Sequence, residues 1–156
     1  MIFFPYNRFR IETDKSKVQV LEILRNNTAP YPSFCIEPST YPFRGKITEN
    51  GFTIHRTIRY NNSFLPLIKG RVTEDNIAIV DVVMRLHAVI SVFMFVWLGC
   101  VGAVCFLVLA NLIVGRQFEP LLMLPFLMFA FGYTLMTLPF QLEANKAVKL
   151  LTSLLE

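Results

Sequence analysis

The chain has 156 residues with a mean hydropathy of +0.49, and 54% of its residues are hydrophobic. This length leaves room for one modest globular unit together with membrane segments, and it excludes two soluble domains. The net charge of +4 is small, and no run of basic residues interleaved with aromatic residues tracks a nucleic-acid backbone. The composition therefore predicts a protein that contacts a lipid bilayer and does not bind nucleic acid.

Charged residues are concentrated in the first part of the chain. Residues 1–87 hold 12 of the 15 lysines and arginines and 8 of the 11 aspartates and glutamates. Formal charge then almost disappears, which is typical of a change from a water-soluble domain to membrane segments. We therefore expect a domain boundary near His87, with an α+β domain ahead of it.

The first part of this domain predicts one strand and one helix. Residues 8–13 alternate apolar and polar side chains, as a half-buried strand does. Asp14-Lys15-Ser16 offers a helix start, and the helix is expected to end at Asn26-Asn27. A proline-bearing loop, residues 30–42, follows the helix, since proline denies strand pairing there.

Two segments, residues 43–54 and 68–79, match each other along the chain. Each is typical of a β-hairpin, because turn-forming residues separate two stretches of strand-like alternation. Duplication and independent convergence on good hairpin chemistry both explain the match. Together they predict a four-stranded antiparallel meander with strands at about 43–48, 52–60, 64–73 and 77–86.

Glycines occupy equivalent positions in the two hairpins. Gly45 and Gly70 lie in the leading strands, where they suggest paired bulges or a close approach of neighbouring backbones. Gly51 and Asn76 are the last residues of the two turn stretches, and both tolerate a positive φ.

Arg56 and Asp81 fill equivalent repeat positions, each within a row of otherwise apolar side chains. If both rows face the core, neither charge is stable alone, so the pattern favours an ion pair between them across the intervening strand. A ligand-facing site and simple exposure on a solvated face are the alternatives.

Two uncharged stretches, residues 88–114 and 120–142, follow the soluble domain. At about 1.5 Å per helical residue, each is long enough to cross a hydrocarbon core of about 30 Å. Neither has the polar stripe of a soluble helix. The predicted fold is an α+β N-terminal domain, made of one helix and an antiparallel β-meander of two repeated hairpins, followed by an α-helical transmembrane hairpin.

The charges beside the hairpin predict its orientation. Arg85 precedes the first span, Lys146 and Lys149 follow the second, and Arg116 lies in the turn between them. The positive-inside rule then places both termini in the cytoplasm.

Small residues in the first span offer a packing surface. Gly99, Gly102 and Ala103 are candidates, and Gly99 with Ala103 forms a small-xxx-small pair that lets another helix approach closely. Packing against the second span of the same chain is the expected use, and homodimerisation is the alternative.

The tail, residues 143–156, predicts an amphipathic helix. Its apolar face consists of Ala147, Leu150, Leu151 and Leu154, and its other positions include Glu143, Lys146, Lys149 and Ser153. We expect this face to dock onto the soluble domain, with a bundle formed by another copy as the alternative.

Catalytic and metal-binding motifs are missing from the sequence. His55, His87 and Cys35 lack companions at metal-ligand spacing, and no phosphate-binding loop, nucleophile elbow or HExxH pair occurs. We therefore predict no metal, no cofactor and no enzymatic activity. Arg85 and His87, at the membrane edge, are instead candidate contacts for lipid headgroups.

The strings FxGxI at residues 43–47, GFxIxRxIxYxNSFLPxIxG at 51–70 and MRLH at 84–87 resemble a group of small bacterial membrane proteins with two transmembrane helices. The strings are specific, but the group carries no known activity. The resemblance implies a bacterial inner-membrane setting and assigns no site residues.

Two functions from different classes fit these observations. In the first, a non-catalytic accessory or regulatory protein binds a protein partner through its cytosolic domain and is anchored by its hairpin. In the second, the sheet binds a small ligand and the hairpin forms a homo-oligomer that perturbs the bilayer.

Overall fold

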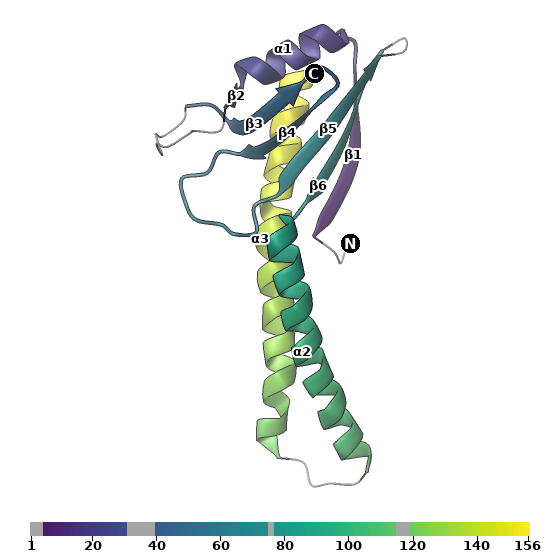
Figure 1. The fold of residues 1–156 in the computed structure, drawn as a ribbon, viewed down its shortest axis with the longest axis vertical. Helices are drawn as coiled ribbons and strands as arrows, with labels where there is room; N and C mark the ends of the chain where they lie inside the picture. The colour runs from purple at the N-terminus through teal and green to yellow at the C-terminus, as the bar shows by residue number, and fades with distance from the viewer. Residues whose placement is uncertain (1–4, 31–39, 75–76, 115–118) are drawn as a thin grey trace. The chain divides into compact units, whose positions relative to one another are not determined.

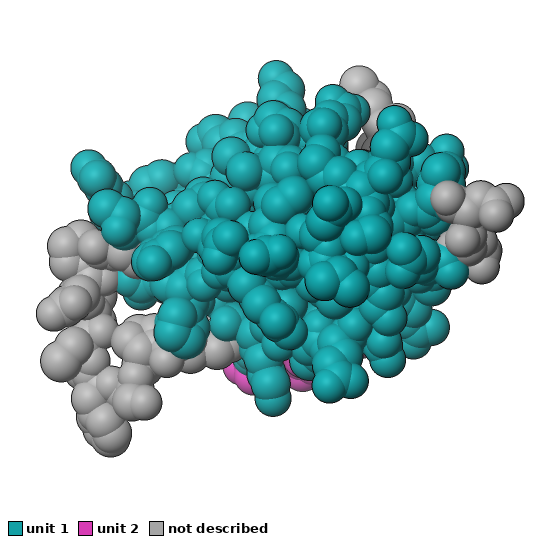
Figure 2. All heavy atoms as spheres, turned by 90° about the horizontal axis from the view of Figure 1, so that it is seen from above, with its two compact units in different colours: residues 1–87, 139–156 teal, residues 88–138 magenta. Residues whose placement is uncertain are grey.

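The computed structural model describes residues 5–30, 40–74, 77–114 and 119–156. The chain divides into two compact units, coloured separately in Figure 2. Residues 1–87 and 139–156 form the first, here called the sheet unit, and residues 88–138 form the second, the hairpin unit. The α+β layout followed by a C-terminal helical hairpin is confirmed. The turn around Arg116, the hairpin tip at residues 75–76 and the lone Cys35 lie outside the described residues.

The predicted first strand and helix are both present, as β1 (Tyr6–Thr13) and α1 (Lys17–Asn26). The helix begins with a capping box. The Ser16 hydroxyl accepts a hydrogen bond from the Gln19 backbone N–H at 3.3 Å, and the Gln19 side chain accepts one from the Ser16 N–H at 2.9 Å. These two bonds satisfy backbone donors that the helix itself leaves free, so the helix starts where the sequence predicts.

The predicted meander is confirmed, and it forms part of a larger sheet (Figure 1). Its strands are β3 (Phe43–Thr48), β4 (Gly51–Arg56), β5 (Leu67–Glu74) and β6 (Ala78–Arg85). β1 pairs antiparallel with β6, and the short β2 (Thr28–Ala29) pairs in parallel with β3. The resulting six strands have the order β1-β6-β5-β4-β3-β2.

The second and third strands of the meander are shorter than predicted. β4 ends at Arg56, and β5 begins at Leu67. Pro66 has no backbone N–H to donate, and Asn62 accepts a hydrogen bond from the Phe64 N–H at 3.0 Å, which closes a local turn. The segment between the strands therefore forms a loop.

The two strand glycines allow close packing and do not form bulges, because strand pairing runs without interruption past both of them. A Cβ atom on Gly45 would lie 2.2 Å from the Thr53 carbonyl oxygen, and one on Gly70 would lie 2.1 Å from the Phe52 ring. Gly45 has a φ of +155°, and it is the only residue in the described ranges with a positive φ. Gly51, which tolerates a positive φ, does not adopt one, and Asn76 lies outside the described residues.

One face of the sheet is buried. Its fully or nearly fully buried side chains come from alternate strand positions: Ile11, Ile54, Ile68, Val72, Val80, Val82 and Met84. Two helical segments of the sheet unit supply further buried side chains, among them Val20 and Leu24 of α1 and Phe140, Leu151 and Leu155 of α3 (Leu124–Leu155). This apolar layer is the core of the unit.

The tail part of α3 packs against the rest of the sheet unit, as expected. The buried face differs in part from the predicted one. Ala147 and Leu151 are buried as predicted, whereas Leu150 and Leu154 are half-buried. Leu155 is fully buried, and its carbonyl oxygen accepts hydrogen bonds from Thr13 Oγ1 at 2.7 Å and Lys15 Nζ at 2.9 Å. The end of α3 is thus bonded to the start of the chain.

The hairpin unit contains α2 (Ala88–Ile113), the short 3-10 helix η1 (Pro120–Met123) and the first part of α3. By length and composition, α2 and the η1–α3 segment are both long and apolar enough to cross a membrane. Few side chains of the hairpin unit are buried, and these are small or flexible ones: Met94, Cys105, Val108 and Met136.

The three candidate packing residues of α2 have different surroundings. A Cβ atom on Gly102 would contact the Phe129 ring at 3.5 Å, so Gly102 does face the second helix. Gly99 meets nothing within 4 Å, and Ala103 is exposed. The prediction of packing within the chain is therefore confirmed for Gly102 and wrong for Gly99 and Ala103. The closer notch lies on α3 instead, where the Trp97 ring covers Gly132.

This notch gives a matched pair of substitutions. A Cβ atom on Gly132 would lie 1.9 Å from the Trp97 ring, so we expect Gly132→Ala to destabilise the hairpin unit by about 1–3 kcal/mol through overpacking. Gly99→Ala places the same methyl group in open space and should leave the stability unchanged or slightly raised. Thermal unfolding of both full-length variants in detergent, followed by tryptophan fluorescence, measures the difference. Equal melting temperatures would contradict the Trp97–Gly132 contact.

Candidate functional site

Arg56 and Asp81 each form an ion pair, but not with one another. Asp81 Oδ1 lies 3.1 Å from Arg10 Nε on the neighbouring strand β1, where Arg10 and Asp81 are directly paired. Arg56 Nε lies 3.3 Å from Glu143 Oε2 of α3. The predicted pair is wrong because alternation in β6 buries Val80 and Val82, which turns Asp81 to the opposite face.

Glu143 is the centre of the first candidate site, the Glu143 cluster, which also comprises Arg56, Tyr60 and Lys146. The Glu143 side chain is 2% exposed. Its Oε1 atom accepts hydrogen bonds from the Tyr60 hydroxyl and, at 2.9 Å, from Lys146 Nζ, while Oε2 faces Arg56. The cluster therefore joins the end of β4, the loop after it and the tail part of α3.

The surroundings of Glu143 shift the proton affinities of three groups. Burial alone would raise the pKa of Glu143, but the hydrogen bonds from Tyr60 and Lys146 and the charge of Arg56 outweigh it and lower that pKa. The hydrogen bond that Tyr60 donates to Glu143 raises the pKa of Tyr60, and the hydrogen bond that Lys146 donates to Glu143 raises the pKa of Lys146. The carboxylate is thus held in its charged form.

Glu143, which the sequence pattern leaves off the apolar face of the tail, is buried. Phe140 and Ala147, three residues before Glu143 and four after it, are both buried. Helical periodicity puts all three on one face, so the spacing of Glu143 from Phe140 is the sequence signal that predicts its burial. A buried carboxylate needs charged or hydrogen-bonding partners, which Arg56, Lys146 and the neutral Tyr60 hydroxyl provide.

Removing Arg56 tests the cluster. Arg56→Ala leaves a carboxylate that is 2% exposed without its guanidinium partner, so we expect the sheet unit to lose about 2 kcal/mol of stability. Arg10→Ala is the matched control, since its side chain is 54% exposed and exposed pairs contribute less than about 1 kcal/mol. Chemical denaturation of the full chain in detergent compares them, and a loss no greater for Arg56→Ala than for the control would contradict the buried pair.

The cluster also predicts a dependence on pH. Because folding lowers the pKa of Glu143 below its ordinary value of 4.5, its stabilising contribution is complete above that value and is lost as the pH falls through the lowered pKa. Wild type should therefore unfold at higher temperature than Glu143→Gln near neutral pH. This difference should shrink as the pH falls below 4.5 and vanish below the lowered pKa of Glu143, where both carry an uncharged side chain. A difference that grows with acidification would contradict this assignment.

The second candidate site is the unburied face of the sheet, here called the basic face. Direct pairing places Arg10, Asp81 and Arg71 in one row across β1, β6 and β5. A neighbouring row runs from Arg8 through Val83 and Lys69 to Thr53 and Lys46. The exposed cations of this face are Arg8, Arg10, Lys46, Lys69, Arg71 and Arg85.

These cations have few acidic neighbours. Asp81 is already bonded to Arg10, and Glu12 lies at the far end of β1. Across the described parts of the chain, Arg8, Lys46, Lys69, Arg71 and Arg85 form no ion pair or side-chain hydrogen bond. Unneutralised cations on one surface create a positive potential that attracts anions.

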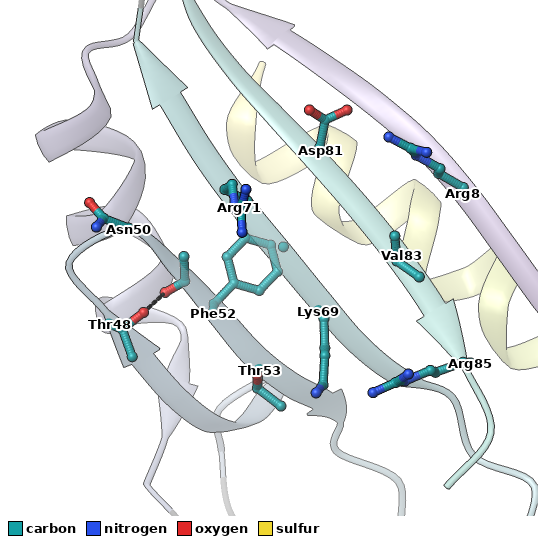
Figure 3. Close-up of a pocket in the computed structure, with 12 residues that line it drawn as sticks. Arg8, Thr48, Asn50, Phe52, Thr53, Lys69, Arg71, Asp81, Val83 and Arg85 are labelled. Carbon is teal, nitrogen blue, oxygen red and sulfur yellow. Dashed lines mark hydrogen bonds between the residues drawn. The ribbon is translucent and has the colours of Figure 1, made fainter. Parts of the chain in front are cut away.

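The basic face is hollowed over β4, β5 and β6. The hollow has a volume of about 630 Å³ and is lined by four of the cations, Arg8, Lys69, Arg71 and Arg85 (Figure 3). Thr48, Asn50 and Thr53 line its other side, and Gly51 contributes no side chain between Thr48 and Arg71. Figure 3 shows the guanidinium end of Arg85 extending toward the side on which Lys69 lies.

His55 is half-buried, whereas Arg85 and His87 are exposed. Arg85 ends β6 and belongs to the hollow, and His87 follows it as an exposed residue. Cys100 is exposed and Cys105 is buried, and both are free thiols. In the described part of the chain, no group of three or more His, Cys, Asp or Glu side chains is placed to hold a metal ion.

Comparison with protein-family models, with curated proteins and with solved structures finds no match to this chain. The resemblance to small bacterial membrane proteins therefore stays a prediction.

Proposed function

We propose that this chain is a membrane-anchored accessory or regulatory protein without catalytic activity. In this proposal the hairpin unit crosses the bilayer and the sheet unit binds a negatively charged partner in the cytoplasm. The basic face is the observation that carries the proposal, because it is an exposed surface of unneutralised cations. The opposite face of the sheet is already buried in the core.

Exposed apolar side chains support the membrane location. Phe95 is 78% exposed, Ile113 85% and Leu121 74%, and similar side chains occur along both helices. Soluble proteins rarely expose so much contiguous apolar surface, whereas lipid is the natural solvent for it. The excess of Arg85, Lys146 and Lys149 over Arg116 favours cytoplasmic termini, and the resemblance favours a bacterial inner membrane.

The partner takes one of two forms. A protein with an acidic surface would make the chain an accessory subunit. A small anionic ligand would make it a sensor whose hairpin self-associates and perturbs the bilayer, and two observations favour this second form. The basic face contains a hollow of small-molecule size, and Gly99 and Ala103 are exposed on α2, where a second copy can approach closely.

Cross-linking in native membranes tests this function. The wild-type chain should stay in the membrane fraction after an alkaline wash and be released by detergent together with its partner. Lys69→Glu, a charge reversal on the basic face, should reduce the cross-linked partner about tenfold, while Arg25→Glu on exposed α1 should not. Release of the chain by the wash would contradict the anchor, and equal capture by both variants would contradict the basic face.

A further inference from the structure

We propose that the hollow of the basic face binds a small soluble polyphosphate of the nucleoside polyphosphate class. This inference rests on the proposed function, because it names the negatively charged partner of the same face.

The charge of the hollow selects a multivalent anion. Arg8, Lys69, Arg71 and Arg85 line it without partners among the described residues. Lys69 and Arg71 lie on the same side of β5, roughly 7 Å apart along the strand, and Arg85 extends the cationic surface onto β6. Like charges this close repel one another in the empty site. A ligand with several phosphates neutralises them together, whereas a single carboxylate reaches only one or two.

The chemistry of the cations favours phosphate. Guanidinium groups donate two parallel hydrogen bonds to phosphate oxygens, and a lysine ammonium adds a point charge. Asp81 is the acidic side chain that lines the hollow, and Arg10 holds its carboxylate at 3.1 Å. The negative charge of Asp81 is thereby compensated from outside the hollow, so it opposes an incoming anion less.

The side chains that line the opposite side of the hollow are uncharged and polar. Asn50 accepts a hydrogen bond from Lys17 Nζ at 2.7 Å, which orients its amide, and Thr48 Oγ1 donates to the Gly51 carbonyl oxygen at 2.9 Å. Thr53 adds a further hydroxyl. These groups donate to and accept from an uncharged polar moiety such as a sugar or a base. The hollow therefore has a cationic end for phosphates and a neutral end for the rest of a nucleotide.

The size of the hollow supports the same class. Its volume of about 630 Å³ falls within the range of roughly 300–1,000 Å³ that is typical of small-molecule sites. Inorganic phosphate would occupy only the cationic end. We therefore expect ATP to bind at least as tightly as tripolyphosphate, and both to bind more tightly than inorganic phosphate.

Isothermal titration calorimetry on the full chain in neutral detergent tests the proposal, with ATP, tripolyphosphate and inorganic phosphate as probes and no anionic lipid present. Saturable binding of ATP and tripolyphosphate that weakens with added salt is expected. Lys69→Gln combined with Arg71→Gln should weaken ATP binding by about tenfold or more, because two charge-assisted contacts are lost.

Arg25→Gln combined with Lys149→Gln is the control, since it removes the same two charge types from exposed positions on α1 and α3. Unchanged binding by this control supports the hollow, and equal weakening in both double variants overturns it. Absence of ATP and tripolyphosphate binding also overturns it, as does binding only to anionic lipid vesicles. If neither polyphosphate binds but Lys69→Glu still loses its cross-linked partner, the polyphosphate inference fails and the proposed function stands.

Discussion

The docking of the tail helix onto the sheet is the interaction on which the sheet unit depends. A sheet with one apolar face must bury that face, and α1, with ten residues, is a short element to cover it alone. Phe140, Ala144, Ala147, Leu151 and Leu155 of α3 supply the rest of the cover from the other end of the chain. The fold of the first 87 residues is therefore completed only by residues that follow both apolar segments.

Within this interface the Glu143 cluster places a charge where apolar packing would be expected. A buried carboxylate is costly unless its partners are well placed, and here an arginine, a lysine and a tyrosine surround it. Arg56 comes from the last position of β4 and Tyr60 from the loop beyond, so only one register of α3 against the sheet brings the carboxylate to both. The cluster thus specifies how the helix docks, in the way that a polar residue specifies register in a helical pair.

The two faces of the sheet serve different purposes because side chains alternate along each strand. Inward positions are apolar and stabilise the unit, whereas outward positions are free of that constraint. Cations from β1, β3, β5 and β6 gather on the outward side, although they are far apart in the sequence. Gly51 lies between Thr48 and Arg71 in one row and has no side chain, so the basic surface is hollowed at this point.

The sequence by itself determined the elements whose signals are local: the capped helix at Ser16, the two hairpins and two helices long and apolar enough to span a bilayer. It did not determine which residues meet across the chain. Equivalent repeat positions suggested a pair between Arg56 and Asp81, yet each found its partner on an element that the repeat does not contain, on α3 and β1. Only the tertiary structure decided this, because the pairing of β1 with β6 and the docking of α3 bring together residues separated by more than seventy positions. No local pattern of propensity or alternation encodes such distances.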